Sequence, residues 1–235
     1  MIRILAASIV LLAAGAAGAG AESSSTPAPA SKSGSSSGVP AAPQVAVLET
    51  TLGTIVIKFH DKDAPKTVAN FKKLVRDKFY DGTCFHRVIP GFMIQGGDPN
   101  SKDADPSNDG LGGPGYTVPA EIKLPHLRGS VATARTGDQV NPSRASSGSQ
   151  FFIDVAPQRS LDEGGYTVFG EVIQGMDVVD KIVALGADPS TPRGAGGPNP
   201  GKKAQIKHAE LEPLSKYAKP AAAPKSEANT DTTGK

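Results

Sequence analysis

The chain of 235 residues has 25 Lys+Arg against 23 Asp+Glu, a single Cys and no Trp, with 27 Gly and 20 Pro. A net charge of +2 excludes a strongly basic nucleic-acid binder, and one cysteine excludes a disulfide framework or a multi-thiolate metal site. Gly and Pro make up about a fifth of the chain, against an average of roughly 12%. We therefore expect many loops or unfolded segments, and a core built on Val, Ile, Leu and Phe.

The N-terminus has the three-part pattern of a secretory signal peptide. Arg3 supplies a positive charge, residues 4–20 carry no charge, and Ala19-Gly20-Ala21 is typical of a cleavage site. A membrane anchor is the alternative, but the apolar run is shorter than the ~20 residues of a span, and its second half is only Ala and Gly. We expect residues 1–21 to be a signal peptide.

Two further segments have compositions that do not favour a packed core. Residues 22–43 are mostly Ser, Ala, Pro and Gly, and residues 214–235 are rich in Lys, Ala, Pro and Thr. Such segments bury too little apolar surface to offset their conformational entropy. The sequence therefore predicts a disordered linker, one folded domain over 44–213, and a disordered C-terminal tail.

The folded part begins with a predicted β-hairpin and a helix. Residues 45–50 and 55–59 are β-branched runs separated by a short turn. Asp61 and Asp63 precede Pro65, which favours a helix start, and apolar residues then recur at helical spacing as far as Phe79. Gly82 is expected to end this helix.

Short β-like runs follow, separated by loops rich in Gly, Pro, Asn and Asp. They cover residues 84–88, 93–96, 130–134, 151–155 and 167–172, and the last predicted strand is 204–211. A second helix fits 176–185, and 186–203 is a further Gly/Pro loop. Many short strands and only two helices indicate a mainly β fold with an antiparallel sheet, and closure into a barrel would remove exposed sheet edges.

Most residues that could carry familiar enzyme chemistry lack the context they need. The four histidines, His60, His86, His126 and His208, have no partner at metal-ligand spacing, so no metal site is predicted. Residues 110–115 match G-x-G-x-x-G, but no strand precedes them and no helix follows, so a surface loop is expected. Cys84 has no base beside it and is expected to be a small buried hydrophobe.

One stretch combines polar and apolar groups at unusual density, Phe85-His86-Arg87-Val88-Ile89-Pro90-Gly91-Phe92-Met93-Ile94-Gln95-Gly96-Gly97-Asp98. Because side chains alternate along strands, Arg87, Met93 and Gln95 can share one face across the Pro90-Gly91 turn. Spacing alone leaves open a simpler interpretation, in which Arg87 extends to solvent at a strand end and Phe92 is core.

This stretch resembles the signature of the cyclophilins, the cyclosporin-binding family of peptidyl-prolyl cis-trans isomerases. Two more blocks support the resemblance, in the family's order: residues 129–136 followed by 148–153, and Leu161-Asp162 followed by residues 166–170. The similarity runs from about Val45 to Pro213. It implies a closed eight-stranded antiparallel barrel capped by two α-helices, and an isomerase that needs no nucleophile, metal or cofactor.

The resemblance also implies a set of site residues. Arg87 takes the place of the catalytic arginine, expected to stabilise the twisted amide. The proline-ring pocket is implied to consist of Phe92, Met93, Phe152 and Leu161. Gln95 and Gln150 correspond to polar groups beside the substrate backbone. Ala134 and Arg135 lie on the strand along which the substrate is expected to bind. For Ala134 and Arg135 the expected contacts are largely through the main chain.

Three departures from the family pattern affect ligand preference. Ser160 stands where well-known members carry a Trp associated with cyclosporin binding, so weak binding of that drug is expected. Tyr166 holds the place of a substrate-pocket histidine, as in bacterial members, and Arg135 replaces a usual Asn. The loops 98–115 and 136–148 look long and are expected to border the groove.

The sequence thus predicts an exported, monomeric isomerase, in a bacterial periplasm, that acts on proline-containing stretches of unfolded or newly secreted chains. Nucleic-acid partners and stable membrane insertion after signal removal are not expected. A non-catalytic module that grips proline-containing segments is the first alternative. A structural role, in which linker and tail hold the domain near an envelope surface, is the second.

Overall fold

The computed structural model describes residues 42–194 and 196–217. The predicted signal peptide, almost all of the predicted linker and most of the predicted tail lie outside these residues. Leu214–Lys216 forms a 3-10 helix, and Leu214 and Tyr217 pack against buried valines of the first two strands, so described structure continues past Pro213. Within the described ranges, no helix combines the length and the apolar character needed to cross a membrane.

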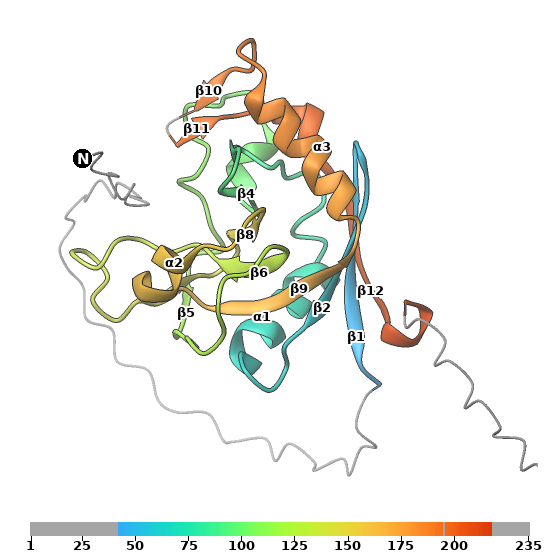
Figure 1. The fold of residues 1–235 in the computed structure, drawn as a ribbon, viewed down its shortest axis with the longest axis vertical. Coiled ribbons are helices and arrows are strands. Elements are labelled where there is room, and N and C mark those ends of the chain that lie inside the picture. Colours follow the sequence, from blue (N-terminus) through green and yellow to red (C-terminus); the bar gives the residue numbers. More distant parts are fainter. Residues whose placement is uncertain (1–41, 195, 218–235) are drawn as a thin grey trace, which may run out of the picture.

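One antiparallel sheet of eight strands forms the body of the molecule (Figure 1). Its order is β12-β1-β2-β9-β6-β8-β4-β3. The bounds are β1 Gln44–Thr50, β2 Gly53–Phe59, β3 Arg87–Ile89, β4 Met93–Gly96, β6 Ser130–Thr133, β8 Phe151–Asp154, β9 Val168–Gln174 and β12 Ile206–Pro213. The predicted hairpin is confirmed, since β1 and β2 pair from Val45 with Lys58 to Thr50 with Gly53.

The sheet curls but does not close, so the predicted closed barrel is wrong. The edge strands β12 and β3 do not pair with each other. The segments that precede β3 and β12 contact each other over a few residues only. Cys84 and Gln205 form an isolated β-bridge, and the Phe85 N–H donates to the Ala204 carbonyl at 2.8 Å. The resulting half-barrel is covered at its open ends by helices and loops.

The described residues form three α-helices, where two were expected. These are α1 Pro65–Arg76, α2 Arg159–Gly164 and α3 Met176–Ala187, and α1 and α3 lie at opposite ends of the curled sheet (Figure 1). Helix α1 ends before Phe79 because Lys78 has a φ of 55° and the Phe79 N–H reaches back to the Leu74 carbonyl, 2.9 Å, as in a Schellman motif. The main core fills the space between α1, α3 and the sheet.

Shorter elements fill the long loops. They are β5 Thr117–Val118 paired with β7 Ser146–Ser147, β10 Arg193–Gly194 paired with β11 Gly197–Pro198, and the 3-10 helices Pro99–Lys102 and Gly201–Ala204. The predicted loop 186–203 therefore contains a two-stranded ladder. That ladder lies beside β3, where it reaches the site described next.

Candidate active site

The hairpin of β3 and β4 brings the residues of the longest sequence block to one face. Arg87 lies opposite Gln95, and Ile89 lies opposite Met93. The two-strand pairing is closed by Pro90-Gly91, where Gly91 adopts a φ of 74° that favours glycine. Met93 and Gln95 also pair with β8, which places Phe152 opposite Gln95.

The Arg87 side chain is held at two points and is largely buried, with a relative exposure of 8%. Its Nε donates to the Gly196 carbonyl at 2.7 Å, and its Nη1 donates to Gln95 Oε1 at 3.1 Å. Burial lowers the pKa of the guanidinium from its usual value, and Tyr166 opposes that shift. Because arginine stays protonated in proteins, the site contains a desolvated cation of fixed orientation.

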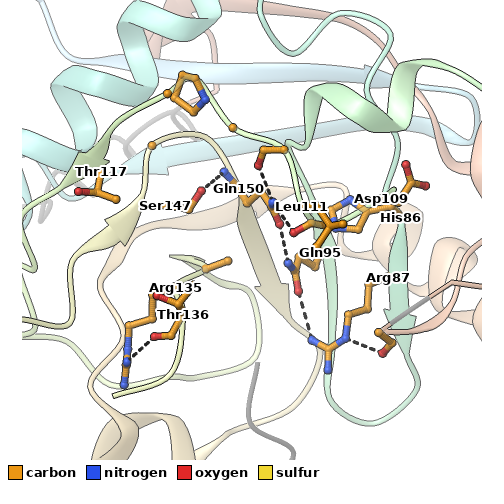
Figure 2. Close-up of a pocket in the computed structure, with 18 of the residues that line it drawn as sticks. His86, Arg87, Gln95, Asp109, Leu111, Thr117, Arg135, Thr136, Ser147 and Gln150 are labelled. Atoms are coloured by element: carbon orange, nitrogen blue, oxygen red, sulfur yellow. Dashed lines mark hydrogen bonds between the residues drawn. The ribbon is translucent and has the colours of Figure 1, made fainter. Parts of the chain in front are cut away.

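A relay of amides continues from Arg87 to the loop 98–115 (Figure 2). Gln95 Nε2 donates to Gln150 Oε1 at 2.9 Å. Gln150 Nε2 in turn donates to the carbonyls of Gly110 and Gly112, at 3.0 and 2.8 Å. The polar residues Arg87, Gln95 and Gln150 therefore act as one connected unit that is anchored in a glycine-rich loop.

The predicted pocket residues form an apolar cluster separate from the main core. Met93, Phe152 and Leu161 are buried in it, with exposures of 1%, 1% and 7%. Phe92 and Tyr166 pack against them and remain partly exposed. The structure thus brings together the four side chains expected at a proline ring and adds Tyr166 to them, beside the strand that carries Arg87.

Arg87 and Gln95 also line a groove with a volume of about 640 Å³, whose lining does not include the side chains of the apolar cluster. Residues of both long loops line it, as expected, 109–115 from one and Thr136, Ala145 and 147–148 from the other. The G-x-G-x-x-G stretch is part of this wall and does not begin a helix. The Asp98 carboxylate holds it in place by accepting hydrogen bonds from the backbone N–H groups of Gly110 and Gly112.

Ala134 and Arg135 also line the groove, where their main chain is expected to contact the substrate. The Ala134 N–H donates to the Gln150 carbonyl, 2.9 Å, and its carbonyl accepts from Ser147 N–H, 2.7 Å. Ala134 could therefore offer a substrate only the second lone pair of that carbonyl.

The Arg135 guanidinium turns away from Arg87 (Figure 2) and binds the C-terminal carbonyls of α2, Gly164 and Gly165. It also lies 4.7 Å above the Tyr166 ring and forms an ion pair with Asp138 at 2.6 Å. Helix carbonyls at a C-terminus lack partners within the helix, so Arg135 caps α2, which carries Leu161. The side chain that replaces a usual Asn is therefore a support of the pocket wall.

Sequence reasoning missed several groups near the site. Gly196 was expected in a loop with no role at the site, although its carbonyl accepts from Arg87. Asp98 was noted only as the last residue of the signature stretch, although its carboxylate holds the groove wall. His126 and Asp154 form a buried pair behind Phe152, with His126 Nδ1 2.8 Å from Asp154 Oδ2. His126 and Asp154 are 28 positions apart, so no local spacing signal could have joined them.

Comparisons with known proteins agree with this geometry. Residues 45–211 match the family model described as cyclophilin type peptidyl-prolyl cis-trans isomerase. A Synechococcus elongatus peptidyl-prolyl cis-trans isomerase is 53% identical over 127 residues, covering 54% of this chain and 78% of that protein. A mouse peptidyl-prolyl cis-trans isomerase-like 1 is 42% identical over 146 residues, covering 60% and 80% of the two chains.

A Cryptosporidium parvum cyclophilin type peptidyl-prolyl cis-trans isomerase gives a TM-score of 0.60 at 28% identity, over 72% of this chain and 98% of that one. A second crystal structure of that protein, obtained in the presence of the dipeptide Ala-Pro, gives a TM-score of 0.58 at 26% identity.

The half-barrel, the buried arginine and the adjoining apolar cluster define a peptidyl-prolyl cis-trans isomerase. The chain belongs to the cyclophilin-type family of these enzymes.

Proposed function

We propose that this chain accelerates rotation about X–Pro bonds in unfolded or newly exported polypeptides, with Arg87 as the catalytic residue. One observation carries the proposal: the desolvated Arg87 cation lies beside the Phe92, Met93, Phe152 and Leu161 cluster, with its guanidinium held on the side of the groove. Anchoring a ring and presenting donors to its amide requires those two features side by side.

The chemistry follows from the nature of the bond. Amide resonance sets a barrier of ~18–20 kcal/mol, so uncatalysed exchange takes on the order of tens to hundreds of seconds. In the transition state the amide is twisted, and its nitrogen regains a lone pair. An N–H of Arg87 directed at that nitrogen interacts more strongly with the twisted state than with either planar state, which is the condition for faster turnover.

The apolar cluster supplies the second part of the mechanism. The proline ring is held against Phe152, Met93 and Leu161 while the chain on the N-terminal side of the bond rotates in the groove. Gln95 holds Arg87 and is itself held by Gln150, and both amides can contact the substrate backbone. No covalent bond breaks, so rotation requires neither a nucleophile nor an electron carrier.

A non-catalytic proline-binding module is the second candidate. It would use the same cluster to grip proline and would not need an oriented cation. The hydrogen bonds from Arg87 to Gly196 and Gln95 favour the enzyme, because they fix the direction of the guanidinium at a cost in side-chain entropy.

The setting proposed for the enzyme is a bacterial periplasm, and the support is the signal-peptide pattern of residues 1–21. We further propose that the protein is a monomer that binds proline-containing segments and binds cyclosporin weakly, because Ser160 stands at the position associated with that drug.

Two measurements test the proposal. The full chain expressed in a Gram-negative host should appear in the periplasmic fraction with its new N-terminus at Glu22, and an intact N-terminus in the cytoplasm would refute the export. The purified protein should accelerate the proline-limited refolding phase of an unfolded client, and Arg87→Ala should remove the acceleration. Binding of the client without acceleration by the wild type would favour the non-catalytic module.

A further inference from the structure

A buried pair of titratable side chains lies behind the proline pocket and takes no part in the mechanism above. His126 precedes β6, and Asp154 is the last residue of β8. Both side chains have a relative exposure of 0%, and His126 Nδ1 is 2.8 Å from Asp154 Oδ2. The pair is too deep to meet a substrate, so any role in the reaction must act through other residues.

The His126 ring contacts two walls of the pocket directly. It is stacked on Phe152, with ring centroids 5.7 Å apart and an interplanar angle of 10°. It meets Tyr166 edge-on at 6.3 Å, and Phe152 and Tyr166 meet each other at 5.9 Å. Three rings thus form a small cluster in which His126 is the member behind the pocket surface.

The backbone of His126 holds a third wall. Its N–H donates to the Asp162 carboxylate at 2.7 Å, and its carbonyl accepts from the Gln158 N–H at 2.9 Å. Gln158 is the N-terminal cap of α2, and Asp162 follows Leu161 within that helix. A shift of His126 would therefore move Phe152, Tyr166 and the helix that carries Leu161 together.

The pair contains buried polar groups that are only partly satisfied. Burial raises the pKa of Asp154, although the hydrogen bond from His126 opposes the shift. Asp154 Oδ1 and His126 Nε2 have no hydrogen-bond partner among the described protein groups. Apolar residues can often replace buried ionisable pairs without loss of stability, so packing alone does not require an ionisable pair at this place.

We propose that His126, oriented by Asp154, is a positioning residue that fixes the Phe152 ring and the start of α2, and so keeps the proline-ring pocket preformed. The proposal rests on the assignment of this cluster as the proline pocket. Arg87 is held independently, by Gln95 and Gly196. Loss of the pair should therefore weaken ground-state and transition-state binding alike, which raises KM and leaves kcat nearly unchanged.

The test uses the full chain with His126→Ala, Asp154→Asn and two controls. His208→Ala removes the other His–Asp pair of the described residues, His208 Nδ1 to Asp81 Oδ2 at 2.9 Å, on β12. Ile206→Ala removes a fully buried side chain of the main core and matches the expected loss of stability. Kd for an Ala-Pro peptide is measured by NMR titration, and kcat and KM by exchange spectroscopy, below each variant's unfolding transition.

We expect His126→Ala to raise Kd and KM roughly tenfold or more, with kcat within about threefold of the wild type. Asp154→Asn, whose amide oxygen can still accept from His126, should remain within about threefold of the wild type in Kd. Both controls should remain within about twofold. Met93 packs in the cluster with Phe152, so its methyl group reports on the pocket. The chemical shift of a ¹³C-labelled Met93 methyl should change in His126→Ala and remain unchanged in the two controls.

An unchanged Kd in folded His126→Ala would overturn the proposal, as would an equal rise in Ile206→Ala or a loss confined to kcat. The Kd comparison does not depend on turnover. If the wild type binds the peptide without accelerating exchange, the proposed function fails, while the positioning role of His126 is still decided by Kd.

Discussion

The amide relay predicts a specific consequence of replacing Gln95 by leucine. Gln95→Leu removes the acceptor for Arg87 Nη1 and the donor to Gln150, and leaves the bond from Arg87 Nε to Gly196. A hydrogen bond to a charged group is worth about 1.5–3 kcal/mol, which corresponds to a fall of roughly 10–150-fold in kcat/KM. Loss of the arginine itself should cost ~2.7–4 kcal/mol, roughly 100–1000-fold, and this sets the ceiling.

The assay is chymotrypsin-coupled cis-to-trans exchange of a short Ala-Pro-Phe peptide, and the control is a second Gln-to-Leu change. Gln205→Leu removes a side-chain bond to the Gly82 carbonyl, 2.9 Å, away from the groove, and should leave kcat/KM within about twofold. Since Gln95 acts through Arg87, the double variant Gln95→Leu/Arg87→Ala should match Arg87→Ala within about threefold. A double variant whose loss equals the full product of the single losses would refute the reasoning, because Gln95 would then act independently.

Three other changes have defined outcomes. Arg135→Lys loses the cap on α2 and the contact over Tyr166, so urea unfolding should show a loss of about 1–3 kcal/mol, and an unchanged midpoint would count against that support role. Burial lowers the pKa of His86 to about 4, so the unfolded state takes up a proton first as pH falls from 6.5, and stability drops by up to about 3 kcal/mol by pH 4. His86→Gln should remove that part of the acid loss, and identical pH profiles would contradict the assignment. Burial raises the pKa of the Cys84 thiol to about 11, so iodoacetamide at pH 8 should label the unfolded chain and spare the folded one.

The grouping of Arg87 with Gln95, and of Gln150 with Phe152, could be predicted because these residues are close along the chain or fall in recognisable blocks. Arg87 and Gln95 face each other across one short hairpin, which alternation along strands predicted. Phe152 and Gln150 belong to a second block, and the family resemblance implied that both blocks contribute residues to one site. The apolar cluster then follows from antiparallel register between β4 and β8.

Other features depend on contacts between distant segments, and no local pattern reports them. Helix α2 has six residues, too few for a periodic signal, and is held by Arg135 and by the His126 backbone. The Gly196 carbonyl meets Arg87 across 109 positions. Closure of the barrel was predicted because exposed edges are costly, but the edge strands do not pair; α3 and β11 contact β3, and α1 contacts β12.

Arg87 is proposed to accelerate X–Pro rotation from its fixed position beside the apolar cluster. The most direct test compares wild type and Arg87→Ala in the coupled exchange assay, with peptide affinity measured in parallel. We predict a fall in kcat of roughly 100–1000-fold, with peptide affinity changed by less than about tenfold. Equal turnover by the two folded proteins, or a loss explained wholly by affinity, would contradict the account.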